Sequence, residues 1–223
     1  MQANACDTKV YEAANLPLLD LLPDSPGRVL DCGCGDGGNA RILRERGWRV
    51  EGITISPEEQ QLASAYCERV HLADLEQGLP PEVGTGYDVV LLSHVMEHLR
   101  GPERLLADAR KVLAPGGILA VGLPNTLFFP YRLQLMLGKL EYQRTGVLDH
   151  THVHLYTFET GARLLRENGF RVLTARANGF LPLGGLRRLL PDAVVRQSTE
   201  WACSRFPGVF GEQGVYIAVP DDA

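Results

Sequence analysis

The stretch "VLDCGCGDGG", from Val29 to Gly38, joins a short apolar run directly to a set of glycines. The run "RVLDCG" (28–33) is typical of a buried strand, and "NARILRERG" (39–47) is typical of a helix. Glycines between a strand and a helix let the backbone approach a ligand closely, and the helix N-terminus adds free N–H groups. The stretch therefore predicts a ligand-binding loop at the end of a first strand.

The same alternation of apolar runs and helical patterns continues along the chain. Further strands are expected at 48–53, 69–74, 87–93, 117–123, 170–175 and 213–219, and further helices at 56–68, 102–113 and 158–169. Ser56 is the expected N-cap of the first of these helices, with Pro57 at its first position and Glu59 closing a capping box. Because the strand runs are apolar on both faces, helices should cover both faces of the sheet, which indicates a doubly wound α/β fold.

Two long stretches interrupt this alternation. Residues 124–157 are aromatic and punctuated by prolines, and residues 177–212 precede the last strand. We expect one domain over residues 1–223, with lid or substrate-binding insertions in these two places, because functional segments of such folds follow the strand ends. The segment "NTLFFPYRLQLML" (125–137) is interpreted as a substrate lid, and a helix that packs against a second copy in a homodimer is the alternative.

Composition limits the classes of function. The net charge of −5 argues against a protein that binds duplex nucleic acid, because such a protein carries a basic face. No apolar run approaches the ~18 residues of a membrane helix, and the first residues contain no apolar core of a secretory signal. The five cysteines are scattered, and an odd number suits no disulfide framework. We therefore expect a reduced, cytoplasmic protein.

The glycine loop alone allows two kinds of ligand. Gly33, Gly35 and Gly38 satisfy the G-x-G-x-x-G pattern of dinucleotide-binding loops, which by itself is a weak signal. Asp31 precedes the first glycine, where its charge would oppose a pyrophosphate but suits a cationic ligand. A nicotinamide enzyme keeps an acid for the ribose at the end of its second strand, and this chain has Thr54 there. Both features favour a cationic ligand over a nicotinamide dinucleotide.

Taken in order, the motifs resemble those of class I S-adenosylmethionine (SAM)-dependent methyltransferases. The family pattern D-x-G-x-G matches Asp31, Gly33 and Gly35, and the acid after the third strand matches Asp74. "GYDVVLLSHVMEHL" and "LAPGGILAVGLPN" are similar to the fourth and fifth strand units of the family. Tyr11 and "LDHTHVHLYTFET" are similar to segments of its small-molecule branch, methyltransferase types 11 and 23. The resemblance implies a Rossmann-like, seven-stranded, mostly parallel sheet with an antiparallel last strand.

The resemblance also implies how SAM would be held. The glycines would line its methionine part, with Asp31 near the amino group, Tyr11 over the carboxylate and the Ser93 backbone on the same side. Asp74 would accept a hydrogen bond from the adenine amine. Thr54 would hold one ribose hydroxyl, and Glu59 or Gln60 would reach the other. The full set of expected cofactor-binding residues is Tyr11, Asp31, Gly33, Cys34, Gly35, Thr54, Ile55, Asp74, Leu75 and Ser93.

Five of the six histidines fall in two short stretches, "SHVMEHL" (93–99) and "LDHTHVHLYT" (148–157). The first holds His94, Glu97 and His98, and three interpretations remain open: a short helix beneath the cofactor, a general base, or a metal site. The segment is similar to the E-x-x-E-H of ubiquinone-pathway and small-RNA methyltransferases, with His94 in place of the first acid. We expect no metal, but Glu97 and His98 would be first ligands if one binds, and zinc or iron would suit them better than magnesium.

The second stretch holds His150, His152 and His154, which on an extended segment would project to one side. The polar rim of an active-site mouth is the alternative interpretation. Within the resemblance the Thr151-His152 pair matches a recurring motif, so His152 is the first candidate for a catalytic residue, followed by His98 and His94. Because both stretches follow strand ends, we expect them to lie together at one edge of the sheet.

These observations indicate a SAM-dependent methyltransferase that yields S-adenosyl-L-homocysteine as the product of SAM. The expected acceptor is an O, N or C nucleophile of a small molecule, as in secondary-metabolite or glycan pathways, with no nucleic-acid partner and no insertion into a membrane. Two alternatives remain: an NAD-dependent oxidoreductase, and a SAM-binding regulatory protein that performs no chemistry.

Overall fold

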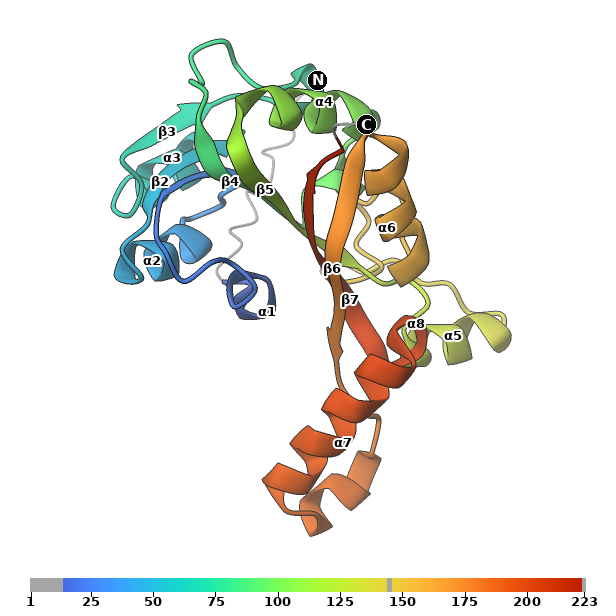
Figure 1. The fold of residues 1–223 in the computed structure, drawn as a ribbon. Coiled ribbons are helices and arrows are strands. Elements are labelled where there is room, and N and C mark those ends of the chain that lie inside the picture. Colours follow the sequence, from blue (N-terminus) through green and yellow to red (C-terminus); the bar gives the residue numbers. More distant parts are fainter. Residues whose placement is uncertain (1–13, 144–145, 222–223) are drawn as a thin grey trace.

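The computed structural model describes residues 14–143 and 146–221, which form a twisted sheet with helices on both faces (Figure 1). The strands are β1 (Arg28–Cys32), β2 (Arg49–Thr54), β3 (Arg69–Leu72), β4 (Tyr87–Ser93), β5 (Leu113–Pro124), β6 (Phe170–Gly179) and β7 (Gly211–Pro220). Their order in the sheet is β3-β2-β1-β4-β5-β7-β6. The strands run parallel to one another except β7, which is antiparallel to both β5 and β6, so the predicted fold class is confirmed.

The helices between the strands include those predicted from the apolar patterns. The α-helices are α1 (Leu16–Leu19), α2 (Gly38–Glu45), α3 (Pro57–Ala63), α4 (Pro102–Val112), α5 (Phe129–Met136), α6 (Phe158–Glu167), α7 (Asp192–Arg205) and α8 (Pro207–Phe210). The short 3₁₀ turns are η1 (Leu75–Gln77), η2 (Met96–His98) and η3 (Gly184–Leu189). None of the helices in the described part of the chain is long and apolar enough to cross a membrane.

Two apolar cores cover the two faces of the sheet. Leu30, Val90 and Leu92 pack on one face with Leu105 of α4 and Leu165 of α6. Alternating residues of the same strands pack on the other face: Val29, Val89 and Leu91, with Leu18 of α1 and Leu43 of α2. Burial on both faces explains why these strands carry apolar residues at alternate and adjacent positions alike, since a covered parallel sheet has no solvent-facing side.

The strand register places the loops of interest at one edge. Cys32 pairs with Ile53 of β2 and with Leu92 of β4, and Ser93 pairs with Gly122 of β5. The carboxyl ends of these four strands are therefore nearly level. Because β7 runs the opposite way, its first residues reach the same edge, where Gln213 pairs with Pro124 and Asn178.

The two interruptions take different forms. The first holds α5 and a loop that returns to the sheet, and the second holds η3, α7 and α8. In Figure 1, η3 and α7 extend away from the sheet beyond the ends of β6 and β7. β6 continues to Gly179, four residues past its predicted end, because β7 pairs with it that far.

The predicted capping box of α3 is only half formed. The Ser56 hydroxyl accepts a hydrogen bond from the Glu59 N–H at 3.2 Å, as expected. The Glu59 carboxylate does not return to the Ser56 N–H, and instead accepts a hydrogen bond from the Thr54 hydroxyl at 2.5 Å. The Ser56 N–H donates to Thr54 Oγ1 at 3.2 Å. Glu59 is therefore turned from the helix cap toward the end of β2.

Candidate active site

A cleft of about 1420 Å³ lies at the carboxyl edge of the sheet. Eight of the expected cofactor-binding residues line it: Gly33, Cys34, Gly35, Thr54, Ile55, Asp74, Leu75 and Ser93. Asp31 is fully buried within β1, two positions before Gly33, and Tyr11 lies outside the described residues. His94, His98 and His152 line the same cleft, so the structure brings the two predicted groups of residues together.

The glycine loop requires glycine at its first position. Gly33 has φ +76° and Gly35 has φ +54°, both in the left-handed region that side chains rarely adopt. A Cβ added to Gly33 would lie 2.6 Å from Cγ2 of Val95. The Gly33 and Cys34 N–H groups both donate to the Ile53 carbonyl, at 2.8 and 2.9 Å, which ties the loop to the end of β2. The loop thus presents bare backbone to the cleft.

Asp31 is a buried acid with its hydrogen-bonding capacity unused. None of the described residues donates a hydrogen bond to either of its carboxylate oxygens. Burial raises the pKa of Asp31 to about 7, and the nearby Asn39 amide offsets only part of that effect. A cationic ligand above the loop would favour the ionised form, whereas a pyrophosphate would oppose it.

Thr54 and Glu59 form a hydrogen-bonded pair on the cleft wall. Both side chains are almost fully buried, and both residues line the cleft. Gln60, the other residue expected to reach a ribose, does not line the cleft, because its side-chain amide donates to the Val70 carbonyl at 2.9 Å. The pair offers a hydroxyl and a carboxylate to a ligand that carries two neighbouring hydroxyls.

The next part of the wall combines an acid with apolar surface. Asp74 is exposed, and one of its oxygens caps η1 by accepting the Glu76 N–H at 3.0 Å. A carboxylate has further acceptor capacity, so the cap leaves room for a hydrogen bond from a ligand. Ile55 is 69% exposed although it is a large aliphatic residue, and the buried Leu75 lines the same cleft. These residues suit a flat apolar group with an amine at its edge.

A second cluster of side chains lies opposite the glycine loop. Glu97 is completely buried in η2, and its backbone carbonyl accepts hydrogen bonds from Val153 N at 2.9 Å and His154 N at 3.1 Å. These bonds hold the returning loop against η2, so the ring centroids of His98 and His152 lie 4.7 Å apart. Potential ligand atoms of Glu97, His98 and His152 all lie within 4.8 Å of one another.

The hydrogen bonds around this cluster fix the tautomers of its histidines. His152 Nδ1 faces the Val147 carbonyl at 3.0 Å and must donate to it, which leaves Nε2 as an acceptor. His98 Nδ1 lies 3.0 Å from Thr151 Oγ1, whose proton goes to Asp149, so His98 also keeps Nε2 as an acceptor. Burial lowers the pKa of His152 below its ordinary value, although the nearby Glu97 acts in the opposite direction. The neutral form of the His152 imidazole is therefore favoured.

Glu97 adds a third acceptor to the two imidazoles. Its Oε2 atom is buried and receives no hydrogen bond from the described residues. Acceptors that converge without a donor repel one another. A proton or a cation bound between these three acceptors would remove the repulsion. Two imidazoles and a carboxylate are a donor set for zinc or iron rather than magnesium. The cluster can thus hold a transferable proton or a metal ion.

His94 has a different environment from the other two histidines. Its φ of +55° is the one positive value among the described non-glycine residues. Its Nδ1 lies 3.2 Å from Glu97 Oε1, and its Nε2 lies 3.0 Å from Gln213 Oε1. Burial lowers the pKa of His94, but hydrogen bonds to Glu97 and Gln213 raise it overall. His94 therefore orients Glu97, and both of its ring nitrogens are already engaged.

Sequence reasoning missed the residues that hold His94. Gln213 exchanges two hydrogen bonds with the side-chain amide of Asn15, at 3.0 and 3.2 Å, and the Asn15 amide also donates to Ser93 Oγ at 3.1 Å. Gln213 is 119 residues from His94 in the chain, so no local pattern joins them. The one available signal was topological, because an antiparallel last strand must begin at the carboxyl edge of the sheet.

His150 and His154 do not line the cleft. The segment around them is a turn rather than an extended strand, so side chains two positions apart do not share a side. The His150 side chain is 63% exposed and lies 3.4 Å from Asp149. His154 Nε2 lies 3.2 Å from the Arg100 carbonyl. Of the three alternating histidines, only His152 lines the cleft.

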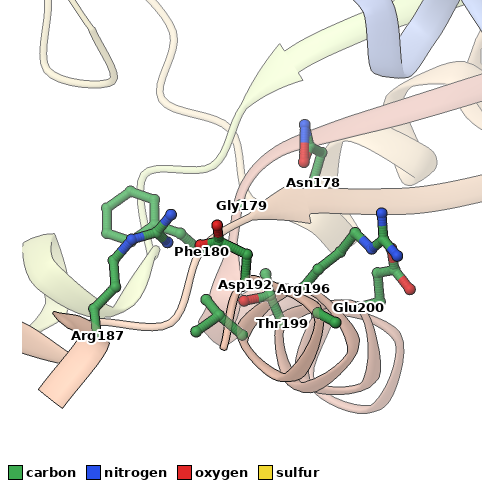
Figure 2. Close-up of a pocket in the computed structure, with 10 residues that line it drawn as sticks. Asn178, Gly179, Phe180, Arg187, Asp192, Arg196, Thr199 and Glu200 are labelled. Carbon is green, nitrogen blue, oxygen red and sulfur yellow. The ribbon is translucent and has the colours of Figure 1, made fainter. Parts of the chain in front are cut away.

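A second hollow of about 650 Å³ lies between the end of β6 and α7 (Figure 2). Asn178 lines both this hollow and the main cleft. Figure 2 shows Arg187 beside Phe180 on one side and Arg196 beside Glu200 on the other. Asp192 also lines the hollow, so its two arginines face two acids. The charges therefore balance, and the hollow shows no preference for an anion or a cation.

Comparisons with known proteins bear on the main cleft. Residues 7–175 match the family described as a methyltransferase domain. The ubiquinone biosynthesis O-methyltransferase of Psychrobacter arcticus is 32% identical over 105 residues, which are 44% of this chain and 41% of that protein. The demethylmenaquinone methyltransferase of Tropheryma whipplei is 35% identical over 95 residues, which are 42% of this chain and 40% of that protein. The chain thus spans less than half the length of these curated relatives.

Solved structures show the same fold at lower identity. The S-adenosylmethionine-dependent methyltransferase of Mesorhizobium loti superposes with a TM-score of 0.60 at 22% identity, covering 91% of this chain and 95% of that one. At this identity the likeness extends to the fold alone.

Proposed function

The chain belongs to the methyltransferase domain family, of the class I SAM-dependent type, and from that premise we propose that it methylates a small molecule. The methyl group of SAM would pass to an O, N or C nucleophile. The observation that carries the proposal is the juxtaposition in one cleft of the glycine loop and the Glu97–His98–His152 cluster. The first suits the cofactor and the second suits an acceptor that must lose a proton.

The residues on the cofactor side fit SAM part by part. The bare backbone at Gly33 and Gly35 leaves room for the methionine chain, and the buried Asp31 carboxyl gains a cationic partner. The Thr54–Glu59 pair offers two polar groups to the two ribose hydroxyls. Asp74 retains acceptor capacity for the adenine amine, beside the apolar surface of Ile55 and Leu75. No residue in this half requires a pyrophosphate.

Bound SAM supplies a methyl group made electrophilic by the sulfonium. The chain would contribute orientation, which for well-aligned reactants removes ~7–11 kcal/mol of the barrier. It would also contribute a base, because the lowered pKa of His152 favours its neutral form, in which Nε2 is an acceptor that faces the cluster. Removal of the acceptor's proton by such a group is worth ~10²–10⁴-fold. His98 Nε2 would take the same role or hold the acceptor in place.

The acceptor is proposed to carry a hydrophobic or ring-shaped group. Leu99, Val147 and Val153 line the cleft beside the histidines and give this end an apolar wall. Two curated relatives are named for ubiquinone and demethylmenaquinone, which supports a ring-bearing acceptor. We propose that the reaction takes place in the cytoplasm. Turnover of labelled SAM against pools of small phenols, quinols and amines would test this acceptor class.

A second candidate role for the cluster is a metal site. The orphaned Glu97 Oε2 and the two Nε2 acceptors fit a divalent cation, which would polarise the acceptor's oxygen or nitrogen. Chelator treatment separates the two roles. If the histidines act as bases, activity survives a strong chelator. If activity is lost and returns with zinc or iron, the metal role is correct and Glu97, His98 and His152 are the ligands.

The insertions are proposed to shape the acceptor side. Residues 146–153 supply part of the cleft wall, whereas α5 contributes no lining and buries none of its own side chains. Met136 is 84% exposed on α5, so this helix suits a lid that closes on substrate or a contact with a second copy. Sedimentation velocity with and without SAM would show which role it has. A SAM-binding protein without catalysis remains the alternative, supported if tight binding is accompanied by no turnover.

A further inference from the structure

The glycine loop carries a cysteine, Cys34, whose sulfur lies near the sulfur of a second cysteine, Cys67. Cys34 lies between Gly33 and Gly35, and Cys67 lies between α3 and β3. A Cβ added to Gly52 of β2 would lie 2.7 Å from Cys34 Sγ and 3.2 Å from Cys67 Sγ. Both sulfur atoms therefore lie over the same point of β2, and only a glycine leaves room for them there. We propose that Cys34 and Cys67 form a disulfide under peroxide stress and that this bond weakens SAM binding.

The two thiols differ in a way that gives the reaction an order. Cys67 is partly exposed, whereas Cys34 is buried. A hydrogen bond to the Cys67 thiol, together with burial, raises the pKa of the Cys34 thiol well above its ordinary range. Because the thiolate is the reactive form, Cys34 reacts poorly with an oxidant on its own. Oxidation therefore begins at Cys67.

The chemistry needs one molecule of hydrogen peroxide. The Cys67 sulfur attacks one peroxide oxygen, the O–O bond breaks, and the products are a sulfenic acid and water. The Cys34 sulfur then attacks the Cys67 sulfur, the S–O bond breaks, and the hydroxyl leaves with the Cys34 proton as a second water. Two thiols and one peroxide thus give one disulfide and two waters. Cys34 is the resolving thiol, for which contact with Cys67 matters more than exposure.

The bond would act on the loop that holds the cofactor. A disulfide has an S–S length of about 2.05 Å and a narrow range of dihedral angles, so Cys34 and Cys67 must draw together when the bond forms. The flanking Gly33 and Gly35 both have positive φ, and their positions set the shape of the methionine pocket. Gly37 also packs tightly here, since a Cβ on it would lie 3.0 Å from Ala63 Cα. The loop therefore has little freedom to absorb the shift.

Coupling between the disulfide and SAM must be reciprocal. If the disulfide weakens SAM binding tenfold, then bound SAM makes the disulfide tenfold easier to reduce. For a two-electron couple that factor corresponds to about 30 mV in reduction potential. Bound SAM should also slow the formation of the bond, for the separate reason that it holds the loop in the shape that the bond must change. This proposal rests on the proposed binding of SAM in the cleft, but bond formation itself does not.

The test has two readouts. The full-length protein is treated with a small excess of hydrogen peroxide, digested without reductant and mapped by mass spectrometry. We expect a peptide that links Cys34 to Cys67. Calorimetry on the same sample should show SAM affinity at least tenfold weaker, restored by dithiothreitol. Added SAM should slow the appearance of the linked peptide.

Cys67→Ser is the decisive variant, because Cys67 does not line the cleft. It should bind SAM as the reduced wild type does and should keep that affinity after peroxide. Cys67→Ala repeats the test if the serine variant is unstable. Cys203→Ser is the matched control, since that buried cysteine lies on α7, away from the loop, and its loss should leave the peroxide effect unchanged.

Three results would overturn the proposal. One is oxidation of Cys67 to higher acids without any Cys34 link. Another is an equal loss of SAM affinity in peroxide-treated Cys67→Ser. The third is a linked protein that binds SAM normally. Failure of reduced wild type to bind SAM would instead contradict the proposed function, and the linked peptide would still report on the bond.

Discussion

The two halves of the cleft are built in different ways. On the side proposed to hold the cofactor (the cofactor side), Gly33, Thr54, Asp74 and Ser93 each lie within two residues of a strand end. On the acceptor side, Glu97 and His98 follow β4 directly, but His152 comes from the far end of a long excursion after β5. The first half is assembled from short, local strand-to-helix turns. The second depends on contacts between segments that are distant in sequence.

This difference predicts different responses to mutation. A change in a local turn should remove one function, cofactor binding, because the turn is held by the sheet beneath it. A change in the acceptor half should affect turnover while SAM still binds, because the cofactor cradle does not depend on the excursion. A mutation in one half that impaired both SAM binding and turnover would show that the two halves are not separate.

The largest effect is expected for Gly33→Val. The new side chain would meet Val95 Cγ2, and a β-branched residue at φ +76° is strongly disfavoured, so the loop must leave its present path. SAM binding should be abolished in calorimetry while circular dichroism still shows a folded chain. Gly84→Ala is the control, since a Cβ there has no atom within 4 Å. Normal SAM affinity in Gly33→Val would mean that the cofactor does not sit on this loop.

The next largest effect is expected for His152→Ala. Turnover should fall ~10²-fold or more, because Nε2 of this residue is the available base or ligand at the acceptor. SAM affinity should remain nearly unchanged, which separates this half from the cofactor side. His150→Ala is the matched control, because its side chain is largely exposed two positions away. Normal turnover in His152→Ala would mean that the histidines of residues 148–157 only form the polar rim of the cleft.

A smaller effect is expected for Asp74→Ala. Loss of the hydrogen bond between this carboxylate and the adenine amine should cost roughly 1–3 kcal/mol of SAM binding free energy. Asp74 also caps η1, so the melting temperature of the free protein must be measured beside the dissociation constant. The SAM affinity of Asp74→Asn should lie between those of the wild type and Asp74→Ala. The single amide oxygen of asparagine cannot accept hydrogen bonds from the η1 cap and from the adenine equally well. An unchanged dissociation constant would place the adenine elsewhere.

The smallest effect is a pH dependence that arises from Asp31. Its pKa in the free folded protein is raised to about 7, whereas a bound cation favours the carboxylate. SAM affinity should therefore rise by about tenfold between pH 6 and pH 8, with proton release on binding at the lower pH. Asp31→Asn should remove this dependence.

The same shift has a consequence for the stability of the free protein. Because the folded-state pKa lies above the unfolded value, the contribution of Asp31 to stability is full at pH values below the unfolded pKa. It is lost as pH rises toward 7. The difference in melting temperature between wild type and Asp31→Asn should change over that interval. A constant difference would contradict the burial of an unpartnered acid.

Much of the cofactor half could be predicted from the sequence, because strand ends and glycines are local signals. The glycine loop, Thr54 and Asp74 all lie where the strand pattern places them. The meeting of His98 and His152 could also be foreseen, since both follow strands that end at the same edge. Which of Glu59 and Gln60 faces the cleft could not, because the answer depends on a hydrogen bond from Thr54.

Less of the acceptor half could be predicted from the sequence. The alternation of His150, His152 and His154 resembles an extended segment, but hydrogen bonds to the Glu97 carbonyl bend it into a turn. His94 contacts Gln213 of β7, and Gln213 is in turn held by Asn15, which lies before α1 at the opposite end of the chain. No periodicity relates such positions. Their contact follows only from the position of β7 between β5 and β6, with its first residues at the cleft.

The central claim is that the cleft holds SAM rather than a dinucleotide, and titration calorimetry tests it most directly. Wild-type protein is titrated with SAM, with S-adenosyl-L-homocysteine and with NAD under the same conditions. The predicted result is one molecule of SAM or its product bound per chain with micromolar-range affinity, and no heat with NAD. Clear heat with NAD and none with SAM would contradict the assignment of the glycine loop, of Asp31 and of Thr54 together.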